Sequence, residues 1–219
     1  MLQPGELTAV LAAQTLNPSI FTHIWLVRYN LFEEKEITES GSMYSPMAVN
    51  VVTADLSFLA IPQRVQVAFD AKKEEPTWCQ KALHRTLGVI AKELPHTPFL
   101  AVGFNLEWVV TAKTALPMTS IERKCFLSDA NPLAKRFQEE DCRFGVYLSK
   151  DFTLGRLKLD IKPVDLKDSS QGARLLFNFH LDLTDDKINQ VAKFLDHWTE
   201  AYETSRAYAT ELETAWSTS

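Results

Sequence analysis

Hydrophobic and polar residues alternate strictly along three segments in the C-terminal half of the chain, residues 142–148, 157–161 and 175–183. Apolar side chains occupy every second position, and mostly charged or polar side chains fill the positions between them. A period of two is that of a β-strand with one buried and one exposed face. The three segments therefore predict an antiparallel meander with an apolar and a polar face, and residues 165–172 form the loop of its second hairpin.

The same period continues in residues 100–110, where Gly103, Asn105 and Glu107 lie on the face opposite the large apolar side chains. Residues 57–70 predict two short strands broken near Pro62, because proline cannot donate a ladder hydrogen bond. Residues 19–29 are β-branched and aromatic, and are apolar on both faces. They predict a central strand, and residues 7–13 are a candidate for a further one.

Two long segments change to steps of three and four residues, which is the spacing of one helix face. The first, residues 76–94, begins after Glu75 and stops at Pro95. The second, residues 185–216, predicts a single long helix capped by Thr184. Shorter helices are predicted for residues 117–127 and for residues 131–139, where Asn131 is the expected N-cap.

These elements predict an α+β fold, in which amphipathic helices cover the apolar face of a mainly antiparallel sheet. The 219 residues suit a single domain over residues 1–219, with a candidate seam near residues 114–120. The acidic and polar stretch 31–46 predicts an exposed loop or a frayed hairpin.

The long C-terminal helix carries the leading hypothesis about function. Thirty helical residues span about 45 Å, whereas a compact chain of this size has a radius of gyration of about 17 Å. The second half of the helix is therefore expected to extend beyond the sheet, and aromatic residues are enriched in interface cores. We expect a non-enzymatic interaction or assembly protein that presents this half to another protein or to a second copy, through Tyr202, Tyr208, Leu212 and Trp216. The competing interpretation packs these side chains against the N-terminal segments of the same chain.

Composition narrows the class of protein. Hydrophobic residues make up 46%, which is enough for a core, and the net charge of −5 disfavours a dedicated nucleic-acid binder. The three scattered cysteines are expected to be reduced thiols. The N-terminus lacks a secretory pattern, and no apolar run reaches the roughly 18 residues that span a bilayer. We expect a cytoplasmic protein that does not contact membranes.

No common catalytic motif occurs in the sequence. Phosphate-binding glycine loops, a nucleophile elbow, a zinc-protease motif and a C-x-x-C pair are all absent. We therefore predict no catalytic residue, no metal site and no cofactor. His180 and Asp182 share a strand face with Asp160, but a solvated polar face explains them more simply than a metal site does.

Two alternatives remain open beside the interaction hypothesis. An enzyme or small-ligand binder would have its pocket near Gly103, Asn105 and Glu107, with His96 or His180 beside it. A nucleic-acid module would use the basic side of the meander. The candidate residues of this ligand or nucleic-acid face are Arg143, Arg156, Lys158, Arg174 and His180, with Lys162 and Tyr147 nearby.

Overall fold

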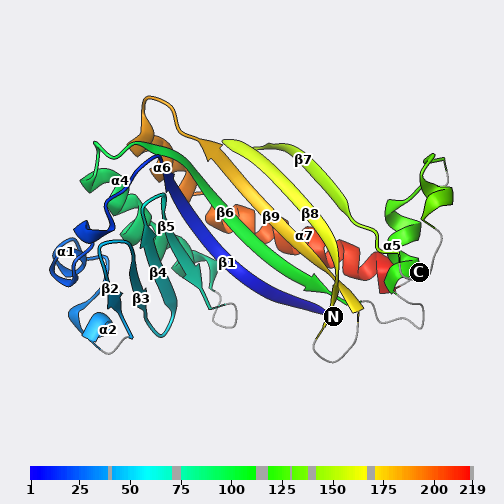
Figure 1. Cartoon of the computed structure of the whole chain (residues 1–219), viewed down its shortest axis with the longest axis horizontal. Helices are drawn as coiled ribbons and strands as arrows, with labels where there is room; N and C mark the ends of the chain where they lie inside the picture. The colour runs from blue at the N-terminus through cyan, green and yellow to red at the C-terminus, as the bar shows by residue number, and fades with distance from the viewer. Residues whose placement is uncertain are drawn as a thin grey trace.

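The computed structural model describes residues 1–38, 41–70, 75–111, 118–128, 130–137, 142–166 and 171–217. These residues form one antiparallel sheet of nine strands in the spatial order β2-β3-β4-β5-β1-β6-β9-β8-β7 (Figure 1). With the helices that pack on it, the sheet confirms the predicted α+β class. The strands are β1 (Leu2–Ala13), β2 (Met43–Tyr44), β3 (Val49–Val52), β4 (Leu56–Ile61), β5 (Arg64–Phe69), β6 (Phe99–Val110), β7 (Val146–Phe152), β8 (Gly155–Asp165) and β9 (Gln171–Asp182).

The middle of the sheet is made by β1 and β6, which pair with each other and join two meanders. The candidate strand at residues 7–13 is confirmed and extends back to Leu2. The two short strands around Pro62 are confirmed as the hairpin β4–β5. The C-terminal meander is confirmed as β7–β8–β9, although β7 begins at Val146 rather than at Cys142.

The helices are α1 (His23–Arg28), α2 (Glu34–Thr38), α3 (Pro76–Leu83), α4 (Val89–Glu93), α5 (Met118–Phe126), α6 (Lys187–Leu195) and α7 (Trp198–Ser217). A π-helical turn, η2 (His84–Gly88), joins α3 to α4, so the helix predicted for residues 76–94 is confirmed. The turns η1 (Pro18–Ile20) and η3 (Ala134–Arg136) are 3₁₀ helices. Glu75 caps α3 by accepting a 2.8 Å hydrogen bond from the backbone N–H of Trp78.

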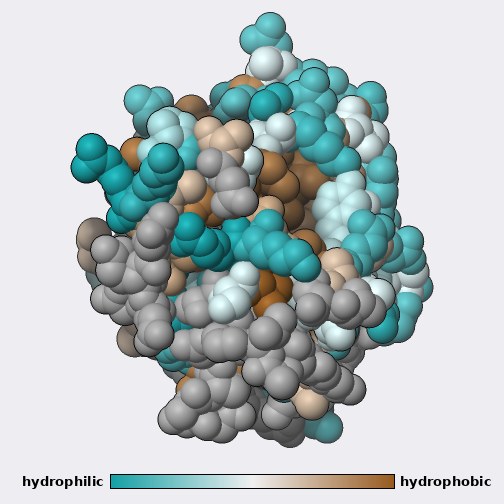
Figure 2. All heavy atoms as spheres, turned by 90° about the vertical axis from the view of Figure 1, so that its right-hand side faces the viewer, coloured by the Kyte–Doolittle hydropathy of each residue, from teal (hydrophilic) through white to brown (hydrophobic). Residues whose placement is uncertain are grey.

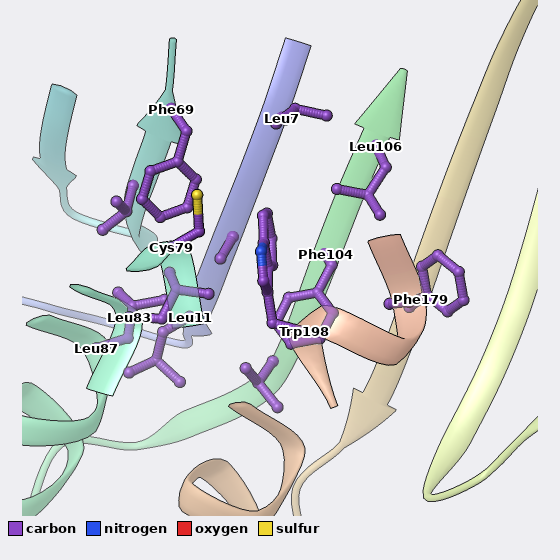
Figure 3. Close-up of a cluster of buried hydrophobic side chains, with 14 of the residues drawn as sticks. Leu7, Leu11, Phe69, Cys79, Leu83, Leu87, Phe104, Leu106, Phe179 and Trp198 are labelled. Atoms are coloured by element: carbon purple, nitrogen blue, oxygen red, sulfur yellow. The ribbon is translucent and has the colours of Figure 1, made fainter. Parts of the chain in front are cut away.

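The core lies between the sheet and these helices (Figure 3). Trp198 is fully buried at its centre, with its ring centroid 5.1 Å from that of Phe104 and 5.2 Å from that of Phe69. Leu83 and Leu87 close the cluster from the α3–η2 side. Burying a side chain of this size contributes about 3 kcal/mol, so Trp198 is a main anchor of α7 on the sheet.

The strand predicted for residues 19–29 is wrong, because this segment forms η1 and α1. Thr22 starts α1 by accepting a 3.2 Å hydrogen bond from the backbone N–H of Trp25. Phe21, Trp25 and Tyr29 recur every four residues, and neighbouring rings lie 5.2 and 4.7 Å apart. Phe21 also packs on Phe58 of β4. These tertiary contacts and the cap outweigh the β propensity of the segment.

The C-terminal helix is two helices rather than the single one predicted, because the chain turns at residues 196–197 between α6 and α7. There the N–H of His197 bonds the carbonyl of Phe194, one residue closer than in an α-helix. The turn lets both Leu195 and Trp198 enter the core. Thr184 does not cap α6; its backbone N–H and its hydroxyl both bond the side chain of Gln190, each at 2.8 Å.

Two other expectations differ from the structure. The helix predicted for residues 131–139 is reduced to η3, and residues 138–139 lie outside the described residues. Asn131 accepts a 3.0 Å bond from Leu133, which makes a local turn rather than a helix start. In the stretch 31–46, expected to be an exposed loop, α2 forms and Leu31, Phe32 and Ile37 are buried.

The candidate seam near residues 114–120 falls mostly on residues 112–117, which are outside the described part of the chain. The helix predicted for residues 117–127 is confirmed as α5. None of the described helices combines the length and the apolar character that a membrane crossing requires.

Candidate functional site

The sheet has two unlike faces. Side chains of β1, β6 and β9 such as Leu7, Phe104 and Phe179 point toward the helices and are fully buried. The alternate side chains point to the opposite face, which we call the open face. Across its centre lies a hollow of about 580 Å³, a size typical of ligand sites. It is lined by Glu6, Thr8, Arg64, Gln66, Asn105, Leu106, Glu107, Tyr147, Lys158, Asp160, Arg174, Leu176, Phe177 and Asn178.

A row of hydrogen-bonded side chains forms part of the floor of the hollow. Thr8, Asn105 and Asn178 lie directly opposite one another on β1, β6 and β9. The amide of Asn105 donates to the hydroxyl of Thr8 at 3.3 Å, and the amide of Asn178 donates to the carbonyl of Asn105 at 2.7 Å. Because each amide is oriented by its neighbour, the remaining donors and acceptors face the hollow in a fixed arrangement.

An ion pair borders this row. Arg174 of β9 donates to Glu107 of β6 at 2.6 Å, and the Glu107 side chain is only 16% exposed. This hydrogen bond is the main cause that raises the pKa of Arg174 above its usual value. Glu107 lies flat over Gly5, where a Cβ atom would come within 2.6 Å of the Glu107 Cγ. Gly5 belongs to the irregularity of β1 between Pro4 and Leu7, so the bulge makes room for the carboxylate.

The lining is balanced in charge, since it contains three acidic and three basic side chains. The basic residues predicted for a nucleic-acid face are mostly paired with carboxylates. Arg143 bonds Asp165 at 2.8 Å, Arg156 bonds Asp151 at 2.8 Å, and Lys162 bonds Asp160 at 2.5 Å. Of the candidate cations, Lys158 and Arg174 reach the hollow.

The candidate histidines lie away from the hollow. His180 contacts Asp182 at 2.9 Å, while Asp160 pairs with Lys162 and does not complete a ligand set with them. Among the described residues, no group of three histidines, cysteines or carboxylates could hold a metal ion. His96 is an exposed residue in the turn before β6 and does not line the hollow.

The second half of α7 runs beside the sheet, and its C-terminal end reaches α5 (Figure 1). Tyr202 packs on Trp108, Tyr208 on Phe177, and Trp216 on Phe126 of α5. Trp216 is fully buried and Tyr202 is 6% exposed, so neither presents a surface to a partner in this conformation. Tyr208 and Leu212 are half-buried and are the members of the set that remain accessible.

A small apolar groove of about 150 Å³ lies where Tyr208 of α7 meets β7 and β8. Its walls come from β7, β8 and α7, and are Leu148, Ser149, Lys150, Leu157, Leu159 and Tyr208. Leu148 was expected to face the core, but it is 51% exposed. Figure 2 views the molecule from the end that carries α5 and the C-terminus, and apolar side chains remain visible there between hydrophilic ones.

Sequence reasoning found part of the hollow and missed the rest. Asn105, Glu107, Lys158 and Arg174 were candidates, whereas Thr8 and Gln66 were not. Asn178 of β9 was not a candidate either. Thr8 and Gln66 lie on β1 and β5, and the pairing of β1 with β6 joins residues about a hundred positions apart. Alternation along β1 could have indicated that Thr8 faces away from the core, but not which strand lies beside it.

The comparisons with known proteins indicate no family for this chain, so the function is inferred from the geometry of the hollow. Neither a scan against protein-family models nor a search of curated proteins finds a match for this chain.

Proposed function

We propose that this chain is a non-enzymatic binding protein that holds a polar ligand in the hollow of the open face. The observation that carries the proposal is the oriented row of Thr8, Asn105 and Asn178 beside the Glu107–Arg174 pair. Polar groups that already hold one another in position lose little entropy when a ligand arrives. Of the residues expected around a ligand pocket, Asn105 and Glu107 line the hollow, whereas Gly103, His96 and His180 are not among its lining residues.

Binding fits this arrangement better than chemistry does. Among the described residues, the lining contains no cysteine, histidine or serine. Its hydroxyl Thr8 accepts from Asn105, and its carboxylate Glu107 is engaged by Arg174. The equal number of acidic and basic side chains favours a neutral or zwitterionic ligand over a polyanion. The pairing of Arg143, Arg156 and Lys162 with carboxylates argues the same way against nucleic acid.

A thermal-shift screen of the full chain tests the proposal. The probes are maltotriose and N-acetylglucosamine as neutral compounds, glycylglycine and phosphocholine as zwitterions, and inorganic phosphate as an anion. We expect a neutral or zwitterionic probe to raise the unfolding temperature, because a ligand that binds the folded state stabilises it. Asn105→Ala should abolish that rise. Asn50→Ala should retain the rise in unfolding temperature, because Asn50 lies on the open face, in β3, but outside the hollow. A rise that survives in the Asn105→Ala variant would contradict the proposal.

A second candidate function, contact with another protein or with a second copy through the C-terminal helix, is favoured by the apolar groove at Tyr208. This surface is smaller than the sequence led us to expect, and its accessible members are Tyr208 and Leu212. We place this activity in the cytoplasm. The mass of the full chain in solution tests it, and a mass that stays monomeric at every concentration would count against it.

A further inference from the structure

The charged side chains that line the hollow are not all compensated by one another. Arg174 is bonded to Glu107 at 2.6 Å, and Asp160 is bonded at 2.5 Å by Lys162, which is not itself a lining residue. Three further charged residues of the lining form no ion pair within the described part of the chain, and these are Glu6, Arg64 and Lys158. Their positions decide where a charged ligand group can be held.

At β1, the uncompensated charge is negative. Glu6 lies in the bulge of β1 and is exposed, and its carboxylate accepts a 3.4 Å hydrogen bond from the amide of Gln66. The pKa of Arg174 is raised first by its hydrogen bond with Glu107 and, to a smaller extent, by the charge of Glu6. Because one guanidinium faces two carboxylates, this side of the hollow keeps one negative charge and attracts a cationic group.

At β8, on the opposite side of the hollow, the uncompensated charge is positive. Lys158 is half-buried and lies directly opposite Asn178 of β9. Asp160, two residues further along the same strand face, is already bonded by Lys162. Two ammonium groups therefore accompany one carboxylate, which leaves one positive charge for an anionic group.

Of the two cations without an ion pair, Lys158 is closer to Glu6 than Arg64 is. Arg64 pairs with Ala12 of β1, six positions along that strand from Glu6, so their Cα atoms are about 20 Å apart. Lys158 lies three strands across from β1, in the row that contains Thr8, and its Cα atom is about 15 Å from that of Glu6. Glu6 and Lys158 are therefore the pair that one small ligand can reach.

The row of Thr8, Asn105 and Asn178 lies between these two charges. Each asparagine amide carries donors and acceptors, and the hydrogen bonds within the row use only part of them. Peptide groups carry an N–H and a C=O in the same way, so a peptide laid across the row can both donate and accept. A neutral sugar would satisfy the row but not the charges, and a choline headgroup has no N–H to donate to Glu6.

The separation of Glu6 and Lys158 sets the length of the ligand. Side chains that stand upright from the sheet keep their heads about 15 Å apart, and a charge-assisted hydrogen bond takes about 2.8 Å at each end. The opposite charges of the ligand then lie about 9–10 Å apart, which is the length of about three residues of extended chain.

We propose that the hollow binds a peptide of about three residues with both ends free, its ammonium group at Glu6 and its carboxylate at Lys158. This inference rests on the proposed function and names the class of its ligand. The peptide lies across the amide row, where Asn105 and Asn178 hydrogen-bond to its peptide groups.

Titrations of the full chain with triglycine and with two blocked forms of it test the inference. N-acetyltriglycine lacks the ammonium charge, and triglycinamide lacks the carboxylate. We expect triglycine to bind about fivefold more tightly than either blocked form, because each block removes about one partly exposed ion pair. Shifts of the backbone amide signals in nuclear magnetic resonance spectra give the three dissociation constants.

Matched variants assign the two ends of the peptide. Glu6→Gln should weaken the binding of triglycine about fivefold and leave that of N-acetyltriglycine unchanged, because the acetylated peptide has no charge for Glu6 to hold. Lys158→Met should weaken triglycine to the same extent and leave triglycinamide unchanged. Glu211→Gln and Lys193→Met, which remove exposed charges of α7 and α6 outside the hollow, should not change the affinity for triglycine.

Failure of this inference and failure of the proposed function give different results. The inference alone is contradicted if maltotriose stabilises the unmodified chain but not Asn105→Ala while triglycine does not bind. It is also contradicted if triglycine binds either Glu6→Gln or Lys158→Met as tightly as the unmodified chain. If no probe, triglycine included, depends on Asn105, the inference and the proposed function are contradicted together.

Discussion

At the scale of single residues, Glu122 of α5 is where burial and charge conflict most. Its side chain is fully buried, and this burial raises the pKa of its carboxyl from 4.5 to about 7. The charge of Arg143 and the backbone N–H of Phe144 act in the opposite direction but are outweighed. Glu122 was not a sequence candidate, because an isolated glutamate in a helix is normally exposed.

This raised pKa makes the stability of the fold depend on pH. The folded state holds the Glu122 proton more tightly than the unfolded state does. The stability that this proton contributes is therefore fully present below about pH 4.5 and is lost as the pH rises through about 7. The size of the effect is about 3 kcal/mol at most. Glu122→Gln should therefore unfold at higher urea concentration than the unmodified chain at about pH 8, and should match it at about pH 4. Glu211→Gln, at an exposed position of α7, is the control. Equal pH dependence of the unmodified chain and Glu122→Gln would contradict this account.

Two glycines allow a matched test of close backbone approach. At Gly155, the first residue of β8, a Cβ atom would lie 2.1 Å from the backbone oxygen of His180, whereas at Gly41 it would meet nothing within 4 Å. Because a backbone oxygen cannot move aside as a flexible side chain can, Gly155→Ala should destabilise the fold by about 1–3 kcal/mol. Gly41→Ala should change the free energy of unfolding little. Urea unfolding measures the free energy of unfolding of both variants. Equal changes would show that β8 and β9 can move apart at Gly155 without a measurable loss of stability.

At the scale of elements, α7 is tied to the sheet by a buried polar contact as well as by apolar packing. The indole N–H of Trp108 in β6 donates to the hydroxyl of Ser205 in α7 at 2.9 Å. Ser205 is fully buried, so Ser205→Ala should cost about 1–3 kcal/mol by leaving the indole N–H without an acceptor. In the Trp108→Phe background the same change should cost much less. Additive losses in this double-mutant cycle, measured by urea unfolding, would mean that the hydrogen bond contributes nothing.

The elements that could be predicted from sequence are those with one apolar and one polar face. β8, β9 and β6 have this pattern, and it predicts which of their side chains, such as Leu159, Phe177 and Phe104, face the core. Residues 19–29 are apolar on both faces, so their pattern does not separate a strand from a buried helix. The break after Leu195 was not predictable either, because the helical spacing continues through it.

The hollow was predictable only in part for a similar reason. Asn105 and Glu107 stand out on their own strand, but Thr8 and Arg64 join them through strand pairing that no local pattern contains. Likewise, alternation predicted Leu148 to be a core residue. In the structure, α7 covers this end of the sheet only in part, and the groove between Tyr208 and Leu148 stays open. Which apolar side chains of an edge strand stay uncovered depends on the length and placement of the covering helix.

At the scale of the whole molecule, the two faces of the sheet have different roles. One face carries the helices and the core, in which Trp198 and Trp216 are fully buried. The open face keeps polar side chains in a preset arrangement around a hollow of about 580 Å³. Since the core is complete without the open face, substitutions such as Asn105→Ala should affect ligand binding far more than stability.

The most direct test of a ligand site on the open face is the set of side-chain amide signals in a proton–nitrogen correlation spectrum. The chain is titrated with the probe that stabilises it most strongly in the thermal-shift screen. We expect the amide signals of Asn105, Asn178 and Gln66 to shift, and those of Gln80 and Gln190, which bond Thr199 and Thr184 outside the hollow, to stay in place. Unmoved signals of Asn105 and Asn178 with a probe that demonstrably binds would contradict the account.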